Sequence, residues 1–275
     1  MANSRGTVAT GNPRKATAAA LQAYVLHHYD WRESSLILDL FTRERGRVIV
    51  VAKGAKRPYS QLRPVLLPFQ RISVQLGRAP ADDAAEVHLL RTAEWAGGVP
   101  TVAGGALFRG FYLNELLMKL LARQDPHETL FDAYRHTLPA LSGDESPATT
   151  AALRAFELVL LRETGVLPEL HCVTQTRAAL VPQRHYGLHA DSGLTDRGTA
   201  TPAHGAQDSV PGQVWLALHA ALTAGDLGAL QTACLPALPA LRQQLRALLQ
   251  YHLGHAALRT RQVMLEVQRL MESPR

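Results

Sequence analysis

Cysteine is scarce in this chain of 275 residues, which contains only Cys172 and Cys234. Two cysteines cannot build a disulfide framework, and so few thiols are typical of a protein from a reducing compartment. No uninterrupted apolar run reaches the length of about 18 residues that a membrane span requires. The N-terminus is polar and lacks the apolar core of a secretory signal. We therefore expect a cytoplasmic protein without a membrane partner.

Sequence motifs of catalysis are also missing. The chain has no GxxxxGK[ST], GxSxG or HExxH motif and no GxGxxG after an expected strand, and Gly54-Ala55-Lys56 lacks the spacing of a phosphate-binding loop. The carboxylates of the first 80 residues are too scattered for a nuclease metal cluster: Asp30, Glu33, Asp39 and Glu44. The sequence thus predicts no enzyme activity, no catalytic residues and no nucleotide cofactor.

Acidic residues are few in the N-terminal part, where basic residues gather. Residues 1–80 contain 13 Lys/Arg and 4 Asp/Glu, a net charge of +9, whereas the remaining 195 residues have a net charge of −3. Arginines alternate through the turn at 43–47, and further cations follow at 53–57 in a loop that contains Gly54. This asymmetry indicates that the N-terminal part meets a polyanion. The alternative is a solvated basic face without a ligand.

Short apolar runs dominate the same region. Strands are expected at 21–26, 36–41, 48–52, 66–76 and 86–92, with a polar turn at 29–34 and a hairpin loop at 77–85. Five short strands with almost no helical period predict a small closed β-barrel.

A helical period begins after Gly98. Five leucines fall on one helical face, at positions 113, 116, 117, 120 and 121, and Asp125-Pro126 ends that helix. Further helices are expected at 128–141, 149–164, 212–236 and 238–271, with Gly165 as a C-terminal cap. Residues 166–211 have little periodicity and are too many for a structureless loop in a compact domain. We predict a basic tail at 1–19 that includes Arg14 and Lys15, a barrel domain at 20–98, a helical domain at 99–165 and 212–275, and an insert at 166–211.

Four segments resemble a known protein family, the bacterial recombination mediators called RecO. They are YVLHHYDWRESSLILDLFTRERGRVIVVAKGAKRPYSQLRPVLLPF, FYLNELLMKLL, RAFELVLLRETGVLPEL and LLQYHLGHAALRTRQVM. The resemblance implies a multidomain α+β fold, with an N-terminal oligonucleotide/oligosaccharide-binding (OB) barrel and a mainly α-helical domain interrupted by a small zinc-finger-like insert. It also implies binding of single- and double-stranded DNA, strand annealing, and partnership with RecR and the single-stranded-DNA-binding protein SSB. Such a protein is expected at the nucleoid during repair.

The basic residues of the barrel are the candidate DNA contacts. Cations outnumber free aromatic residues here, so phosphate contacts should dominate, and binding should be sequence-independent and salt-sensitive. Tyr29, Trp31 and Tyr59 fall in turns where they could stack on bases, whereas Phe41 and Phe69 are expected in the core. The predicted footprint is Arg43, Arg45, Arg47, Lys53, Lys56, Arg57 and Arg63.

The insert departs from the family's zinc motif of two cysteine pairs. Cys172 stands at the first position, but Gln175 replaces its partner, and RHYGLHADSG lacks both cysteines of the second pair. Imidazole can replace thiolate as a zinc ligand, and H-x3-H spacing occurs in zinc sites. An altered ligand set that retains zinc would comprise Cys172, His171, His185 and His189, with Asp191 and His204 nearby. The alternative is a metal-free module with surface histidines.

A different function remains open at this point. The helical half is rich in Leu and Ala, so the chain could be a helical protein-interaction scaffold whose basic barrel binds RNA or protein. The leucines at 113–121 are, however, more typical of a core than of an interface.

Overall fold

The computed structural model describes residues 19–77, 87–98, 104–199, 209–254, 258–260, 262–263 and 266. The predicted basic tail apart from Ala19, the predicted hairpin loop beyond Gly77, and His204 lie outside these ranges. None of the helices in the described part combines the length and apolar character needed to cross a membrane.

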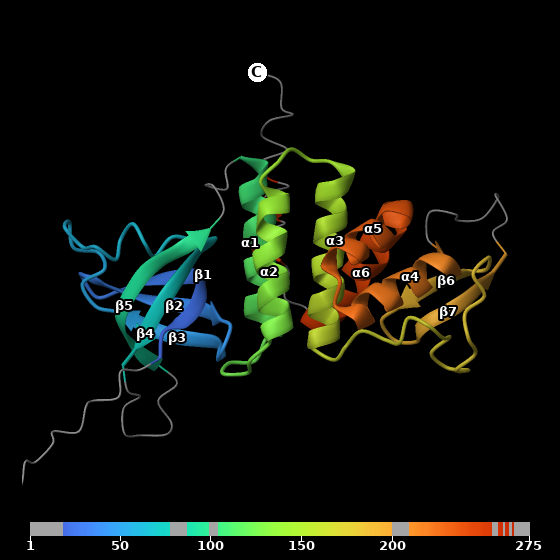
Figure 1. The fold of residues 1–275 in the computed structure, drawn as a ribbon, viewed down its shortest axis with the longest axis horizontal. Coiled ribbons are helices and arrows are strands. Elements are labelled where there is room, and N and C mark those ends of the chain that lie inside the picture. Colours follow the sequence, from blue (N-terminus) through green and yellow to red (C-terminus); the bar gives the residue numbers. More distant parts are fainter. Residues whose placement is uncertain are drawn as a thin grey trace, which may run out of the picture.

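Five strands close into an N-terminal barrel in the order β1-β2-β3-β5-β4 (Figure 1). They are β1 (Leu21–Trp31), β2 (Ser35–Thr42), β3 (Gly46–Ala52), β4 (Gln70–Leu76) and β5 (Val87–Gly98). Strands β3 and β5 run parallel, and the other neighbours run antiparallel. Because side chains alternate along each strand, every strand contributes aliphatic side chains to the core of the barrel. Examples from β1 to β5 are Val25, Leu38, Val50, Ile72 and Leu90. The predicted five-stranded OB-like barrel is confirmed.

Strand β1 is longer than the sequence predicts. The predicted polar turn at 29–34 is reduced to residues 32–34, because β1 stays paired with β2 as far as the Trp31–Ser35 pair. Arg32 adopts the left-handed conformation, with φ of 51°, in this turn. Residues 27–31 are exposed on both faces of the strand, yet they stay paired with β2, so their polarity does not interrupt the ladder.

The C-terminal part is mainly helical. Its elements are α1 (Gly105–Leu120), α2 (Glu128–Leu141), α3 (Pro147–Glu163), α4 (Gly212–Ala224), α5 (Leu227–Cys234), the short 3-10 helix η1 (Leu235–Ala237) and α6 (Leu238–Leu253). The predicted helix at 212–236 divides because Gly225 adopts the left-handed conformation and the Asp226 side chain caps α5 by accepting from the Ala229 amide at 2.9 Å. The helix predicted at 238–271 is broken: α6 ends at Leu253, Gly254 has φ of 64°, and the described residues 259–260, 262–263 and 266 are helical again, whereas the other positions from 255 to 271, apart from 258, lie outside the described residues.

The insert between α3 and α4 contains a three-stranded sheet with the order β7-β6-β8. Its strands are β6 (His185–His189), β7 (Gly193–Gly198) and β8 (Val210–Pro211). Leu188 and Leu194 belong to the same apolar cluster as the helices, and the Leu188 amide donates to Oε1 of Gln244 on α6 at 2.8 Å. The insert therefore shares the core of the helical domain, at the opposite end of the molecule from the barrel (Figure 1).

The barrel packs against α1 and α2 through an aromatic joint. Tyr24, Phe41 and Phe69 are buried in one cluster with helical residues that include Phe131 and Tyr134, which confirms the predicted core positions of both phenylalanines. Polar contacts support this joint. The Asn114 side chain on α1 donates to the Leu26 carbonyl at 2.9 Å, and the Tyr134 hydroxyl donates to Oδ1 of Asn114 at 2.6 Å. The orientation of the barrel on the helices is therefore specified by directional bonds as well as by apolar contact.

Candidate nucleic-acid interface

The β2–β3 hairpin divides the predicted footprint between two ends of the barrel. Thr42 pairs with Gly46 at one end of the hairpin, and Leu36 pairs with Ala52 at the other. At about 3.4 Å per residue, these ends lie roughly 20 Å apart. We call residues 43–45 the domain-facing turn, because they meet the helices. We call residues 53–67 and the β1–β2 turn at 32–34 the outer loops, because they lie on the side of the barrel away from the helices (Figure 1).

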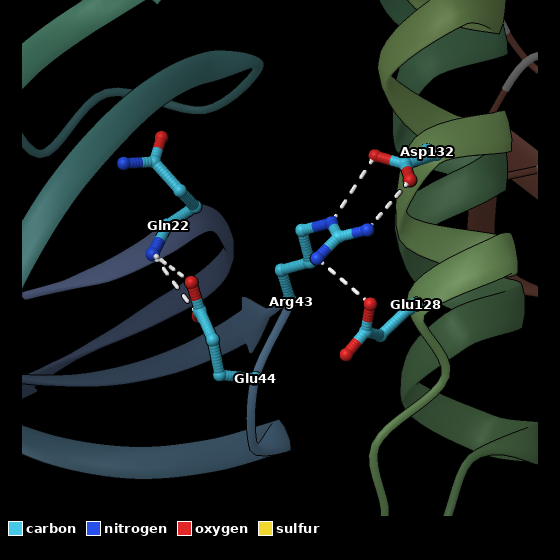
Figure 2. Close-up of polar contacts among 5 residues, drawn as sticks. All are labelled: Gln22, Arg43, Glu44, Glu128 and Asp132. Atoms are coloured by element: carbon cyan, nitrogen blue, oxygen red, sulfur yellow. Dashed lines mark hydrogen bonds and ion pairs between the residues drawn. The ribbon is translucent and has the colours of Figure 1, made fainter.

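Arg43 in the domain-facing turn reaches across to α2. Figure 2 shows its guanidinium between two carboxylates of that helix. Nη1 lies 2.7 Å from Oε2 of Glu128, and Nη2 lies 3.2 Å from Oδ2 of Asp132. Hydrogen bonding to Asp132 is the main cause that raises the pKa of Arg43. Neighbouring Glu44 turns away from this pair and accepts from the Gln22 amide at 3.1 Å (Figure 2).

Arg47 is bound more deeply in the joint. Its Nε and Nη2 donate to the Asp39 carboxylate at 2.9 and 2.7 Å, and the Asp39 side chain is only 3% exposed. Nη1 donates to the carbonyl oxygens at the end of α1, those of Met118 and Leu121. All three nitrogens of the guanidinium are thus engaged by the protein. A DNA role for Arg43 and Arg47 stays a prediction, but both already join the barrel to the helices.

The position after the domain-facing turn can hold only glycine, which is Gly46. Its φ is +64°, and a Cβ at this position would lie 1.8 Å from the carbonyl oxygen of Asp125 in the α1–α2 connection. Any side chain would therefore meet backbone in addition to the strain of positive φ. Arg45, next to this glycine, is exposed, and its amide donates to Oγ1 of Thr42 at 3.1 Å.

The outer loops present the remaining cations. Lys53, Arg57 and Arg63 are exposed and form no ion pair with any described residue. Lys56 is half-buried and ties the two loops together: its amide donates to the Ser34 carbonyl at 3.0 Å, and its Nζ lies 3.5 Å from Oδ1 of Asp30. The structure therefore brings four predicted cations to one end of the barrel, and three of them have no ion-pair partner among the described residues.

Exposed aromatic side chains accompany these cations. Tyr59 is 94% exposed, and Tyr29 and Trp31 near the β1–β2 turn are 52% and 44% exposed. Sequence reasoning missed Arg32, whose guanidinium carbon lies 5.9 Å from the centre of the Trp31 ring. Trp95 is also 65% exposed, but it lies on β5 beside Ile72 of β4 and outside the outer loops; sequence reasoning missed it because the predicted fifth strand ended at position 92. Free cations beside exposed rings are the two components of a surface that binds single-stranded nucleic acid.

The described carboxylates of the barrel do not assemble into a metal cluster. Asp39 is paired with Arg47, Asp30 with Lys56, and the Glu44 carboxylate accepts from a backbone amide. Within the residues that the structure describes, no acidic residue of the barrel joins a group that could hold a metal ion. The described part of the barrel therefore lacks the carboxylate cluster of a metal-dependent nuclease.

The insert does not assemble the expected zinc ligands either. His185 and His189 stand at the two ends of β6, and four residues of strand span about 13 Å, too far for two ligands of one ion. His189 Nε2 lies 2.6 Å from Nη2 of Arg197, and Cys172 is buried. Of the expected set, His171 alone joins a potential metal cluster among the described residues, together with Glu169 and His219. Since the chain offers one insert thiolate, its residues do not fit a zinc site of paired cysteines.

This strand order, with a helical domain packed on the barrel, places the chain in the class of proteins built on an OB-type barrel. The sequence models of two families, described as Recombination protein O N terminal and Recombination protein O C terminal, match residues 18–95 and 104–262. The protein named DNA repair protein RecO of Polaromonas sp. strain JS666 is 50% identical over 252 residues, which covers 90% of this chain and 96% of the relative. Its namesake in Verminephrobacter eiseniae is 48% identical over 249 residues, with the same coverage.

The chain belongs to the RecO family, and its role accordingly lies in DNA repair and recombination.

Proposed function

We propose that this protein is a non-enzymatic recombination mediator that binds single- and double-stranded DNA through the outer loops of its barrel. One observation supports this most strongly. Lys53, Arg57 and Arg63 are exposed without ion-pair partners in the described structure, and they share the outer loops with the 94% exposed ring of Tyr59. These loops lie away from the helical domain, so a long strand can reach them without meeting the helices (Figure 1).

The chemistry of this surface suits a mediator. Phosphate contacts carry no sequence information, so the protein would act at any broken end. Aromatic faces favour unstacked bases, which are available in single strands. Two complementary strands repel each other through their phosphate charges. A surface that neutralises these charges can therefore anneal the strands without nucleotide hydrolysis. The family resemblance suggests two protein partners. With RecR, this protein would help to load the recombinase, and it would do so on single strands that are coated by SSB. This role places the protein in the cytoplasm and at the nucleoid during repair.

The test compares two triple variants of the full chain. The first is Lys53→Gln, Arg57→Gln and Arg63→Gln in the outer loops. The matched control is Arg135→Gln, Arg177→Gln and Arg242→Gln, which removes three exposed cations of the helical domain and insert. Binding to labelled single-stranded and duplex DNA should weaken in the first variant, for all sequences alike, and change little in the control.

Annealing provides the second part of the test. Wild-type protein should accelerate pairing of complementary strands without ATP, and the outer-loop variant should lose this acceleration. A requirement for ATP, or nuclease activity with magnesium or manganese, would refute the non-enzymatic role. Equal competition by single-stranded RNA would instead favour the alternative of a scaffold with an RNA-binding barrel.

A further inference from the structure

Glu169, His171 and His219 converge at the junction between α3, the insert and α4. Glu169 and His171 belong to the segment that leaves α3, whereas His219 lies on α4. One ligand atom from each residue lies within 4.8 Å of the ligand atoms of the other two. The two imidazole rings have centres 4.6 Å apart and planes inclined at 49°. Two imidazoles and a carboxylate are a ligand set that zinc accepts.

The contact between Glu169 and His171 is unusual for a simple ion pair. Nδ1 of His171 lies 3.2 Å from Oε2 of Glu169, yet this buried nitrogen has no hydrogen-bond partner in the described structure. The nitrogen and the carboxylate oxygen are therefore close to each other without a directional hydrogen bond between them, which leaves both atoms available to a shared cation. In a tetrahedral zinc site with bonds of about 2.0–2.1 Å, neighbouring ligand atoms lie roughly 3.3 Å apart. The observed separation matches one edge of such a tetrahedron.

Space for an additional ligand adjoins the cluster. A cavity of about 260 Å³ is lined by Glu169 and His219, together with Arg162, Leu222 and other residues. Arg162 is the cation of this lining, and its Nη1 donates to the Leu222 carbonyl. The cavity can hold a water molecule as a fourth ligand.

We propose that Glu169, His171 and His219 bind a divalent transition-metal ion of the zinc class. The site differs from a paired-cysteine module in its donors and its place, because it contains no thiolate and takes one ligand from α4. It would fasten the segment at 169–171 to α4, and so hold the insert to the helical domain at its first residues. This inference does not depend on the DNA-binding surface, which lies at the opposite end of the molecule (Figure 1).

The experiment uses the full chain without a histidine tag, stripped with a chelator and titrated with Zn²⁺ and with Co²⁺. We expect one ion per chain, a higher midpoint of thermal unfolding with Zn²⁺, and a Co²⁺ spectrum without thiolate charge-transfer bands. Glu169→Gln changes an exposed side chain and His219→Ala a half-buried one, and circular dichroism would verify that both variants fold. Each should weaken binding by more than about 100-fold, the upper range for losing a group that merely supports a ligand.

Two matched variants remove other candidates of the insert. His189→Ala and Cys172→Ser should both keep one ion with unchanged affinity. Absence of binding to the wild-type chain, or full binding to a folded His219→Ala variant, would overturn the proposal. Loss of the ion in Cys172→Ser with retention in His219→Ala would overturn it too, and would return the site to a set that includes the thiolate.

Discussion

The buried pair of Arg47 and Asp39 allows the sharpest prediction about the barrel. In the variant Arg47→Ala, the Asp39 carboxylate, 3% exposed, loses its ion-pair partner. The carbonyls of Met118 and Leu121 lose a donor in the same step. Removing one member of a buried pair costs about 3–5 kcal/mol, because the other charge stays in a poorly solvated place. We expect a loss of unfolding free energy of this size.

Arg43 serves as the comparison within the same turn. Its pairs with Glu128 and Asp132 are half-exposed, so Arg43→Ala should cost much less than Arg47→Ala. A double variant, Asp39→Leu with Arg47→Met, removes both buried charges and should recover most of the lost stability. A double-mutant cycle over these variants isolates the pair from the surrounding contacts.

The assay is urea unfolding at neutral pH, followed by circular dichroism, together with DNA binding under conditions where each variant is folded. Folded Arg47→Ala should keep the salt dependence of wild-type binding, with a change in slope smaller than the value of about 1 expected for one lost phosphate contact. Stability within about 1 kcal/mol of wild type, combined with a clear loss of DNA affinity, would refute the assignment of Arg47 to the joint.

Three further predictions concern the joint, the C-terminal segment and a thiol. Gly46→Ala should destabilise the chain by at least about 1–3 kcal/mol in urea unfolding, because its Cβ would clash with the Asp125 carbonyl at positive φ; a neutral effect would contradict this packing. Burial raises the pKa of Glu115, but hydrogen bonds from Thr260 and neighbouring groups outweigh it and lower the pKa overall. Its stabilising contact is therefore complete above the ordinary glutamate pKa and is lost as the pH falls through the lowered value. Glu115→Gln should accordingly speed tryptic cleavage near residue 259 at neutral pH, and equal cleavage rates would count against this contact. Burial raises the pKa of Cys234 to about 12, so native protein should resist alkylation there at mildly alkaline pH, and rapid labelling would contradict the buried thiol.

Local patterns were sufficient to predict much of the fold. The β-branched run at 48–52 predicts most of β3, and the interval 128–141 coincides with α2. The end of β1 could not be predicted, since its polar residues are paired with β2 and exposed, and a polar stretch of strand has the composition of a turn. The breaks at Gly225 and Gly254 lie inside otherwise helical periods, where a single glycine does not reveal its conformation.

The candidate site was predictable in composition but not in arrangement. Charge density identified the barrel, yet the partners of Arg43 and Arg47 come from α2, α1 and the facing strand, and pairing over such distances leaves no local pattern. The H-x3-H spacing at 185–189 suggested that both histidines bind one metal ion. On a helix, residues four apart would lie next to each other, but these two stand at opposite ends of the extended strand β6. His219 is 48 positions from His171 along the chain, so their proximity follows from packing of α4 against the insert segment.

The central claim is that the outer loops hold DNA through free cations. Its most direct test is the dependence of single-strand affinity on salt for the Lys53→Gln, Arg57→Gln and Arg63→Gln variant, measured beside the Arg135→Gln, Arg177→Gln and Arg242→Gln control. The account predicts that the logarithmic salt slope falls by roughly 2–3 in the outer-loop variant, because each lost phosphate contact lowers it by about 0.7–0.9. The slope of the control should equal that of the wild type. An unchanged slope in a folded outer-loop variant, or an equal fall in the control, would contradict the account.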